Sequence, residues 1–155
     1  MKELIEYRKH LLDKLVSAAK EFRDACLAVT DAHAPMSEGE WNVHQTAAHT
    51  RDVNELVYGL RARRTAQEDN PEFQNFDGDA HMAEHYNTNE PLDEMLDGFI
   101  KNVEELHDFL KNLPADAWSR ESRHVTVGGG FTLQTWIERN LAHIEEHLES
   151  IKKQQ

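Results

Sequence analysis

Apolar residues recur at steps of three, four and seven over the first 29 residues, which is the spacing of an amphipathic α-helix. The helix predicted there covers about residues 4–29. Its apolar stripe consists of Leu4, Leu11, Leu15, Ala18, Phe22, Cys26 and Val29. The following segment, residues 31–40, contains Pro35 and Gly39, and is therefore expected to be a connector.

A second helix is expected to begin after Asn42, because Asn is a favoured N-cap residue and Gln45 occupies the position that completes a capping box. The pattern continues to about Arg64. The inner stripe predicted for this helix is His49, Val53, Leu56 and Leu60. A long polar connection over residues 65–90 follows, with room for a short helix over residues 79–86.

A third helix is expected between Pro91, which suits a first helical turn, and Pro114, which would end the helix. Its apolar positions are Leu92, Leu96, Phe99, Val103, Leu106 and Leu110. Residues 112–130 form a second irregular connection. The three glycines at 128–130 are expected either in a flexible turn or at the end of a short hairpin after residues 125–127.

The fourth helix is expected to have Thr132 as its N-cap, with Phe131 and Trp136 forming a hydrophobic staple. Its apolar face consists of Ile137, Leu141, Ile144, Leu148 and Ile151. Four helices with one apolar stripe each bury those stripes most simply as a bundle. The 155 residues therefore predict a single all-α domain, a four-helix bundle with long irregular connections between helices two and three and between helices three and four.

The chain carries 29 acidic and 17 basic residues, a formal charge of −12. Such a surface argues against binding to nucleic acid or to an anionic membrane. The one basic cluster, Arg61 to Arg64, falls near a predicted helix end, where cations complement the helix dipole. The single cysteine, Cys26, excludes an internal disulfide and is expected to be buried. The first residues lack a signal-peptide pattern, so a cytoplasmic location is expected.

Two histidines, His143 and His147, lie four apart on the fourth helix, where their side chains share one face. Such a pair can bind one metal ion, although a solvated face is the alternative in a chain with ten histidines. Trp136 and Asn140 continue the same stripe, which favours burial. His49 alone would more often be a hydrogen-bonded core residue. If all three imidazoles met, they would leave a position on the ion open, as in catalytic sites.

Two segments resemble the DinB/YfiT-like superfamily. One is Trp41-Asn-Val-His-Gln-Thr-Ala-Ala-His49-Thr-Arg-Asp52, and the other is Asn140-Leu-Ala-His143-Ile-Glu-Glu-His147. The stretch from Phe76 to Glu84 is also similar to a connector found in many members. The resemblance covers about residues 4–152. It implies a four-helix bundle, often a homodimer, with a divalent metal on His49, His143 and His147.

Three nitrogen ligands suit zinc, nickel, iron(II) or cobalt. The resemblance implies either metal-assisted hydrolysis of a small molecule or transfer of a low-molecular-weight thiol. The alternative is a non-catalytic metal-binding bundle in a stress response. Asp52, Asn140 and Glu146 are the residues expected to orient the ligand imidazoles. Val57 and Tyr58 are expected to be exposed and to contribute to a dimer interface.

Three other catalytic patterns have less support. His81-Met-Ala-Glu84-His85 matches an inverted zinc-protease string, but it lies in a short polar connector and is expected to line the mouth of the metal cleft. Glu104 and His107 form half of a di-iron signature, and no second Glu-x-x-His is present. A serine hydrolase motif, Gly-x-Ser-x-Gly, is absent.

Overall fold

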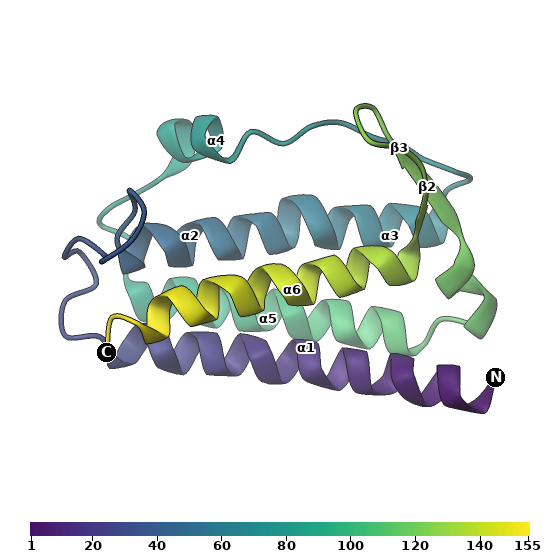
Figure 1. Cartoon of the computed structure of the whole chain (residues 1–155), viewed down its shortest axis with the longest axis horizontal. Coiled ribbons are helices and arrows are strands. Elements are labelled where there is room, and N and C mark those ends of the chain that lie inside the picture. Colours follow the sequence, from purple (N-terminus) through teal and green to yellow (C-terminus); the bar gives the residue numbers. More distant parts are fainter.

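Four helical rods lie side by side in the computed structural model, which describes residues 1–155 (Figure 1). The second rod is continuous through three segments, α2, a π-helical turn η1, and α3. The rods are α1 (Lys2–Ala28), α2 (Val43–Val53) with η1 (Asn54–Gly59) and α3 (Leu60–Gln67), α5 (Leu92–Lys111), and α6 (Leu133–Lys152). A short helix, α4 (Gly78–His85), lies outside the bundle above α2 in Figure 1. No helix combines the length and the apolar character needed to cross a membrane.

Side-chain pairs between rods give their directions. α1 runs parallel to α6, because later residues of α1 contact later residues of α6. It runs antiparallel to α5, because later residues of α1 contact earlier residues of α5. The pairs are Lys14–Glu145 and Glu21–Lys152 between α1 and α6, and Asp13–His107 and Arg23–Asp97 between α1 and α5. The α2–α3 rod closes the ring on the far side, between α5 and α6. α1 and α2, consecutive in sequence, are therefore diagonal.

A contiguous core of 26 buried residues, drawn from α1, α2, α3, α5, α6 and the connections, fills the centre of the bundle. Phe22 on α1 and Phe99 on α5 meet edge-to-face there, with ring centroids 5.6 Å apart. Cys26 is fully buried, as predicted. The fold class predicted from the four apolar stripes is therefore confirmed.

The predicted helix starts are also confirmed. Asn42 accepts a hydrogen bond from the Gln45 backbone N–H, and the Gln45 side chain accepts one from the Asn42 N–H. Thr132 accepts from the Thr135 N–H at 3.2 Å. The rings of Phe131 and Trp136 stack with centroids 4.9 Å apart, so the staple that sets the direction of α6 is formed.

The prediction for the inner face of the second rod is wrong beyond Val53. Leu56 and Leu60 are 42% and 41% exposed, whereas Val57, expected at the surface, is 6% exposed, and Tyr58 is half-buried. The cause is the π-helical turn, which takes more residues per turn than an α-helix and so shifts the buried face by about one position. Gly59 permits this geometry, since a Cβ built on it would lie 2.7 Å from the Asn54 carbonyl oxygen.

A small sheet, which the helical periodicity did not predict, covers one end of the bundle. Its strands are β1 (Glu72–Phe73), β2 (Glu121–His124) and β3 (Gly128–Thr132), and a 3₁₀ turn η2 (Ala115–Ser119) precedes β2. β1 pairs parallel to β2, and β2 pairs antiparallel to β3. Of the two interpretations of the glycine triplet, the hairpin agrees better with the structure. The glycines, however, form the start of β3, and the turn of the hairpin lies before them. Gly128 and Gly130 have φ values of +101° and +84°, which glycine adopts freely.

The basic cluster at the end of the second rod contacts the chain itself. The Arg61 guanidinium lies 4.9 Å from the Trp136 ring centroid. Arg64 stands in the last turn of α3, as the dipole interpretation expects, and pairs with Glu68 at 2.7 Å. The contact of Arg61 with Trp136 ties α3 to the sheet end of α6 and so helps hold α2 and α6 in the register on which the site depends.

Candidate metal centre

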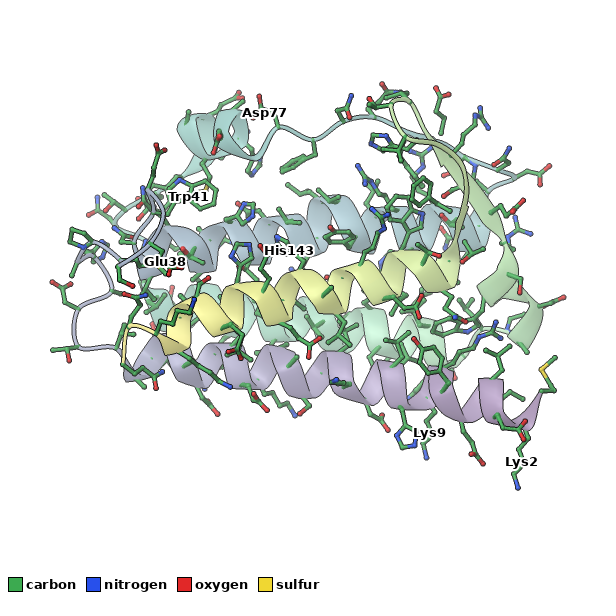
Figure 2. The ribbon with its side chains drawn as sticks, viewed as in Figure 1. Lys2, Lys9, Glu38, Trp41, Asp77 and His143 are labelled. Atoms are coloured by element: carbon green, nitrogen blue, oxygen red, sulfur yellow. The ribbon has the colours of Figure 1, made fainter.

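Three histidine side chains from two rods converge between α2 and α6. The Nε2 atom of His143 lies 3.3 Å from Nε2 of His49 and 3.1 Å from Nε2 of His147. The three ligand atoms all lie within 4.8 Å of one another, and no other trio of His, Cys, Asp or Glu in the chain could hold an ion in this way. The His143 side chain points from α6 into the space beneath α4 (Figure 2).

This arrangement fits a metal ion. Two nitrogens bound at about 2.1 Å to one tetrahedral ion are separated by about 3.4 Å, close to the separations observed here. The i, i+4 spacing on α6 supplies two of the nitrogens, and the antiparallel packing of α2 supplies the third. Three imidazoles without a thiolate suit zinc, nickel, cobalt or iron(II).

Burial keeps these imidazoles in the neutral form that binds metal. It lowers the pKa of His49 to about 4, with a further decrease from His147 and an opposing effect from Asp52. It lowers the pKa of His143 to about 3, helped by His147 and His49. The pKa of His147 is also lowered by burial, against the opposing charge of Glu146. At neutral pH all three rings therefore carry a free lone pair.

Aromatic rings and a close backbone enclose the cluster. The Trp41 ring centroid lies 4.7 Å from that of His49, and the Tyr58 ring lies 5.7 Å from that of His143. A Cβ on Gly78, at the start of α4, would approach the His49 ring to 3.4 Å. α4 thus begins directly against one of the three imidazoles, which places the expected connector at the mouth of the site.

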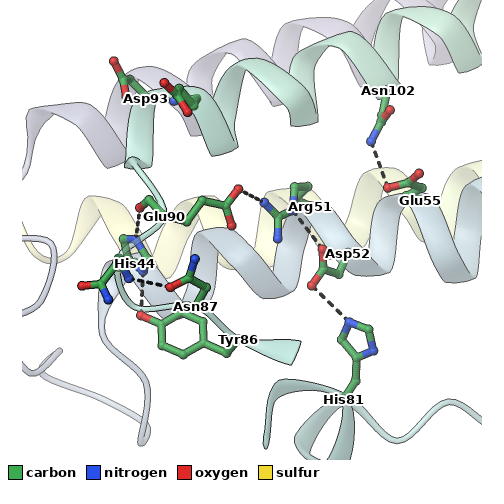
Figure 3. A network of polar contacts seen from close by, with 12 residues as sticks. His44, Arg51, Asp52, Glu55, His81, Tyr86, Asn87, Glu90, Asp93 and Asn102 are labelled. Atoms are coloured by element: carbon green, nitrogen blue, oxygen red, sulfur yellow. Dashed lines mark hydrogen bonds and ion pairs between the residues drawn. The ribbon is translucent and has the colours of Figure 1, made fainter. Parts of the chain in front are cut away.

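Of the three residues expected to orient the imidazoles, Asp52 and Asn140 have other hydrogen-bond partners. Asp52 accepts from Arg51 Nε at 2.9 Å and contacts His81 Nε2 at 3.1 Å, as Figure 3 shows. Glu146 is exposed and acts on His147 through its charge alone. Asn140 is fully buried and donates from Nδ2 to Asn54 Oδ1 at 3.1 Å. Asn140 Oδ1 and His143 Nδ1 are buried without a partner.

His81 is the residue beside the site that sequence reasoning did not single out. In the sequence, His81 stands out only as part of a string that resembles a zinc-protease motif. In the structure its side chain contacts Asp52, whereas Glu84 of the same string is exposed. The one indication of this contact in the sequence is Asp52. It lies three residues after His49, so its carboxylate is on the same face of α2. His107, from the di-iron half-signature, pairs with Asp13 at 3.5 Å and is not part of a metal group.

A second histidine network braces the same end of α2. His44 is 1% exposed and uses both ring nitrogens, Nδ1 to the Tyr86 hydroxyl at 2.6 Å and Nε2 to the Glu90 carbonyl at 2.8 Å. Glu90 also pairs through its carboxylate with Arg51 at 2.6 Å (Figure 3). Together these bonds tie the residues that follow α4 to the N-terminal half of α2, and so hold α4 over the candidate centre.

A cleft of about 290 Å³ opens beside His147. The loop that precedes α2 forms most of its wall, with Asp79 from α4 and Ser150 from α6 on the other sides. Residues 118–131 do not line this cleft, because that segment belongs to the sheet end of the bundle. Glu38, Glu40 and Asp79 make the entrance acidic.

The sequence model of the DinB superfamily matches residues 12–151, nearly the whole chain. The chain belongs to the DinB superfamily. The fold agrees with this membership. YfiT from Bacillus subtilis, described as a probable metal-dependent hydrolase with an unusual four-helix bundle topology, superposes with a TM-score of 0.86 over 96% of this chain and 86% of YfiT, at 18% sequence identity. No curated protein matches this DinB-superfamily chain.

Proposed function

We propose that this DinB-superfamily protein is a metal-dependent hydrolase of small molecules, with one divalent ion held by the Nε2 atoms of His49, His143 and His147. The observation that carries the proposal is the convergence of three uncharged imidazoles beside an open cleft. YfiT, of the same fold, is described as a probable metal-dependent hydrolase, which supports the same class of reaction. Zinc, nickel, iron(II) and cobalt all suit the ligand set.

An ion in this position supplies Lewis acidity towards water or a substrate oxygen. The residues of the chain control the charge and the orientation of the ligand rings. Burial holds the three rings neutral, and Trp41 and Tyr58 pack against two of them, which restricts their rotation. With the ligand rings fixed in this way, an ion held by the three histidines would be accessible from the cleft that His147 lines.

We assign proton transfer to His81, held by Asp52. The Nε2 atom of His81 contacts Asp52 Oδ2 at 3.1 Å, and Arg51 fixes the other oxygen of the same carboxylate at 2.9 Å. His81 is 18% exposed in its side chain, so its ring remains accessible to solvent. Histidine is the side chain that most often transfers protons in hydrolytic reactions. This assignment supplies the base that the sequence alone did not identify.

The charge of the cleft favours hydrolysis over thiol transfer. Glu38, Glu40 and Asp79 line the opening beside His147, and Lys153 reaches only Glu38, at 3.5 Å. An acidic entrance repels an approaching thiolate and accepts neutral or cationic molecules. The substrate class that fits is therefore a small neutral or amine-bearing ester or amide.

The test begins with metal content. Purified protein incubated with zinc, nickel, cobalt or iron(II) is expected to retain one ion per chain. His143→Ala is expected to retain none, and His124→Ala, which alters a histidine of β2, is expected to behave as wild type. Loaded protein is then assayed against matched esters and amides with neutral, cationic and anionic groups, and against an electrophile with added thiol. Wild-type protein that binds no ion would refute the proposal.

The role of His81 is tested separately. His81→Gln is expected to keep the ion and to lower kcat by about 10²-fold or more. The matched control is His85→Gln, since the His85 ring centroid lies 4.6 Å from that of His81 but its side chain is 55% exposed. If both variants keep wild-type kcat, His81 is not the proton-transfer residue. An ion that binds without any turnover across the panel would favour the alternative, a non-catalytic metal-binding bundle.

A further inference from the structure

A cavity of about 470 Å³ lies away from the three histidines. It is formed by the N-terminal half of α1, the C-terminal end of α5 and the residues that follow α5, whereas the histidines lie between α2 and α6. Lys9, which lines this cavity, projects from α1 on the side of the bundle opposite to His143 (Figure 2). Its apolar wall consists of Ile5, Leu12, Leu110, Leu113, Ala115 and Trp118.

A buried arginine without a counter-ion faces this cavity. Arg8 is 8% exposed and lines the cavity wall. Its Nε donates to Gln134 Oε1 at 2.9 Å, its Nη1 donates to the Ala115 carbonyl at 3.1 Å, and the guanidinium lies over the Trp118 ring at 5.5 Å. These partners are all neutral. Buried charges in proteins are normally paired, and guanidinium has five N–H donors, most of them still available here.

The charge around Arg8 differs from the charge of the whole molecule. The chain carries −12, yet Arg8, Lys9 and Lys111 line this cavity with one carboxylate, Asp13. Asp13 contacts His107 at 3.5 Å rather than Arg8. Lys111 pairs with Asp108 at 3.4 Å outside the cavity, so the uncompensated charge belongs to the buried Arg8 and the exposed Lys9. The cavity is thus cationic at one point and apolar over much of its wall.

We propose that this cavity binds a small amphipathic carboxylate, with the carboxylate on the guanidinium of Arg8 and an acyl or aryl body against the apolar wall. Arginine binds carboxylates through two parallel N–H groups, which would use the donors that the protein leaves free. The volume lies within the range of small-molecule pockets. Such a ligand would supply the missing counter-charge and cover the apolar wall in one step. The site is independent of the metal centre.

Sodium octanoate is the test ligand, with octylamine and octan-1-ol as probes of the same chain length. Full-length protein is titrated calorimetrically, both metal-loaded and after chelation, because a carboxylate can also bind a metal ion. Octanoate is expected to bind once per chain in both states, and octylamine and octan-1-ol at least about tenfold more weakly, since hydrogen bonds to charged groups contribute about 1.5–3 kcal/mol. In ¹H–¹⁵N spectra the indole signal of Trp118 is expected to shift, while that of Trp41, at the metal centre, stays in place.

Two variants make the result decisive. Arg8→Gln is expected to weaken octanoate binding about tenfold or more and to leave octan-1-ol binding unchanged. Ala115→Trp, at an exposed position on the cavity wall, is expected to fill the cavity and abolish binding with Arg8 still present, even if Arg8→Gln fails to fold. The proposal is overturned if wild-type protein does not bind octanoate, if octylamine binds as tightly, if chelation abolishes binding, or if Ala115→Trp binds as wild type does.

Discussion

His49 and His143 stand 94 residues apart in the chain, yet their Nε2 atoms lie 3.3 Å apart. The contact depends on the antiparallel packing of α2 on α6, which the buried Asn54–Asn140 hydrogen bond fixes at 3.1 Å about one turn away. The bundle thus brings two uncharged imidazoles together through its own packing contacts. A preorganised site of this kind belongs to a fold that is stable without metal. It differs from sites in which metal binding drives folding.

Chelation is expected to leave the bundle folded. The core of 26 residues contains none of the three histidines, so its burial does not depend on an ion. Metal should add stability only by binding to the folded state, by about 2.7 kcal/mol when free ion exceeds Kd about 100-fold. Far-UV circular dichroism before and after EDTA treatment should therefore show the same helicity, with a lower Tm that recovers on reloading. Loss of the helical signal on chelation would mean that the ion is structural.

The stability of the metal-free protein is expected to fall as the pH is lowered from about 6.5 towards 4. The pKa of His49 is lowered to about 4 and that of His143 to about 3, chiefly by burial, so in this range the unfolded chain binds protons that the folded chain does not. Stability therefore rises with pH across the window. Urea unfolding in EDTA should show this slope. His143→Ala should reduce it, whereas His10→Ala, on the exposed face of α1, should not. Equal slopes in all three proteins would contradict the burial of neutral imidazoles.

Two glycines in helices are expected to respond in opposite directions to alanine. Gly98→Ala on α5 meets no atom within 4 Å and should raise the free energy of unfolding by about 0.5–1 kcal/mol, since alanine favours the helix. Gly59→Ala would place a Cβ 2.7 Å from the Asn54 carbonyl oxygen and should lower it by about 1–3 kcal/mol. Chemical denaturation of both variants measures the difference. A neutral or stabilising Gly59→Ala would argue against the π-helical turn.

Ser122 is expected to be the most sensitive serine of the sheet end. It is fully buried, accepts from Trp136 Nε1 at 2.8 Å and donates to the Phe131 carbonyl at 2.9 Å. Ser122→Ala leaves the indole N–H without an acceptor and should cost about 1–3 kcal/mol of unfolding free energy. Ser119→Ala, at an exposed position nearby, should stay within about 0.5 kcal/mol of wild type. Comparable losses in both would mean that the buried bond contributes nothing specific.

The helices and two of the three candidate ligands, His143 and His147, were accessible from sequence because each depends on local spacing. Helical periodicity gave the rods, the residues at Asn42 and Thr132 gave two helix starts, and the i, i+4 step gave the pair on α6. That His49 would meet this pair depends on tertiary packing, and the sequence indicated it only through the resemblance to a family.

The errors arose where structure depends on residues distant in sequence. Periodicity assumes a regular α-helix, so the π-helical turn moved Leu56 and Leu60 outward and Val57 inward without any sequence signal. β1 pairs with a strand about 50 residues later, through only two residues, which is too short for an alternating pattern. The contact of His81 with Asp52 joins α4 to α2 across a connector, and spacing along the chain does not specify such a contact.

The most direct test of the metal centre is an anomalous-difference map from crystals grown with one equivalent of zinc, recorded on both sides of the zinc absorption edge. One strong peak per chain is expected, about 2.0–2.1 Å from the Nε2 atoms of His49, His143 and His147. A map without a peak there, with the metal bound elsewhere or with the three rings turned apart, would contradict this expectation.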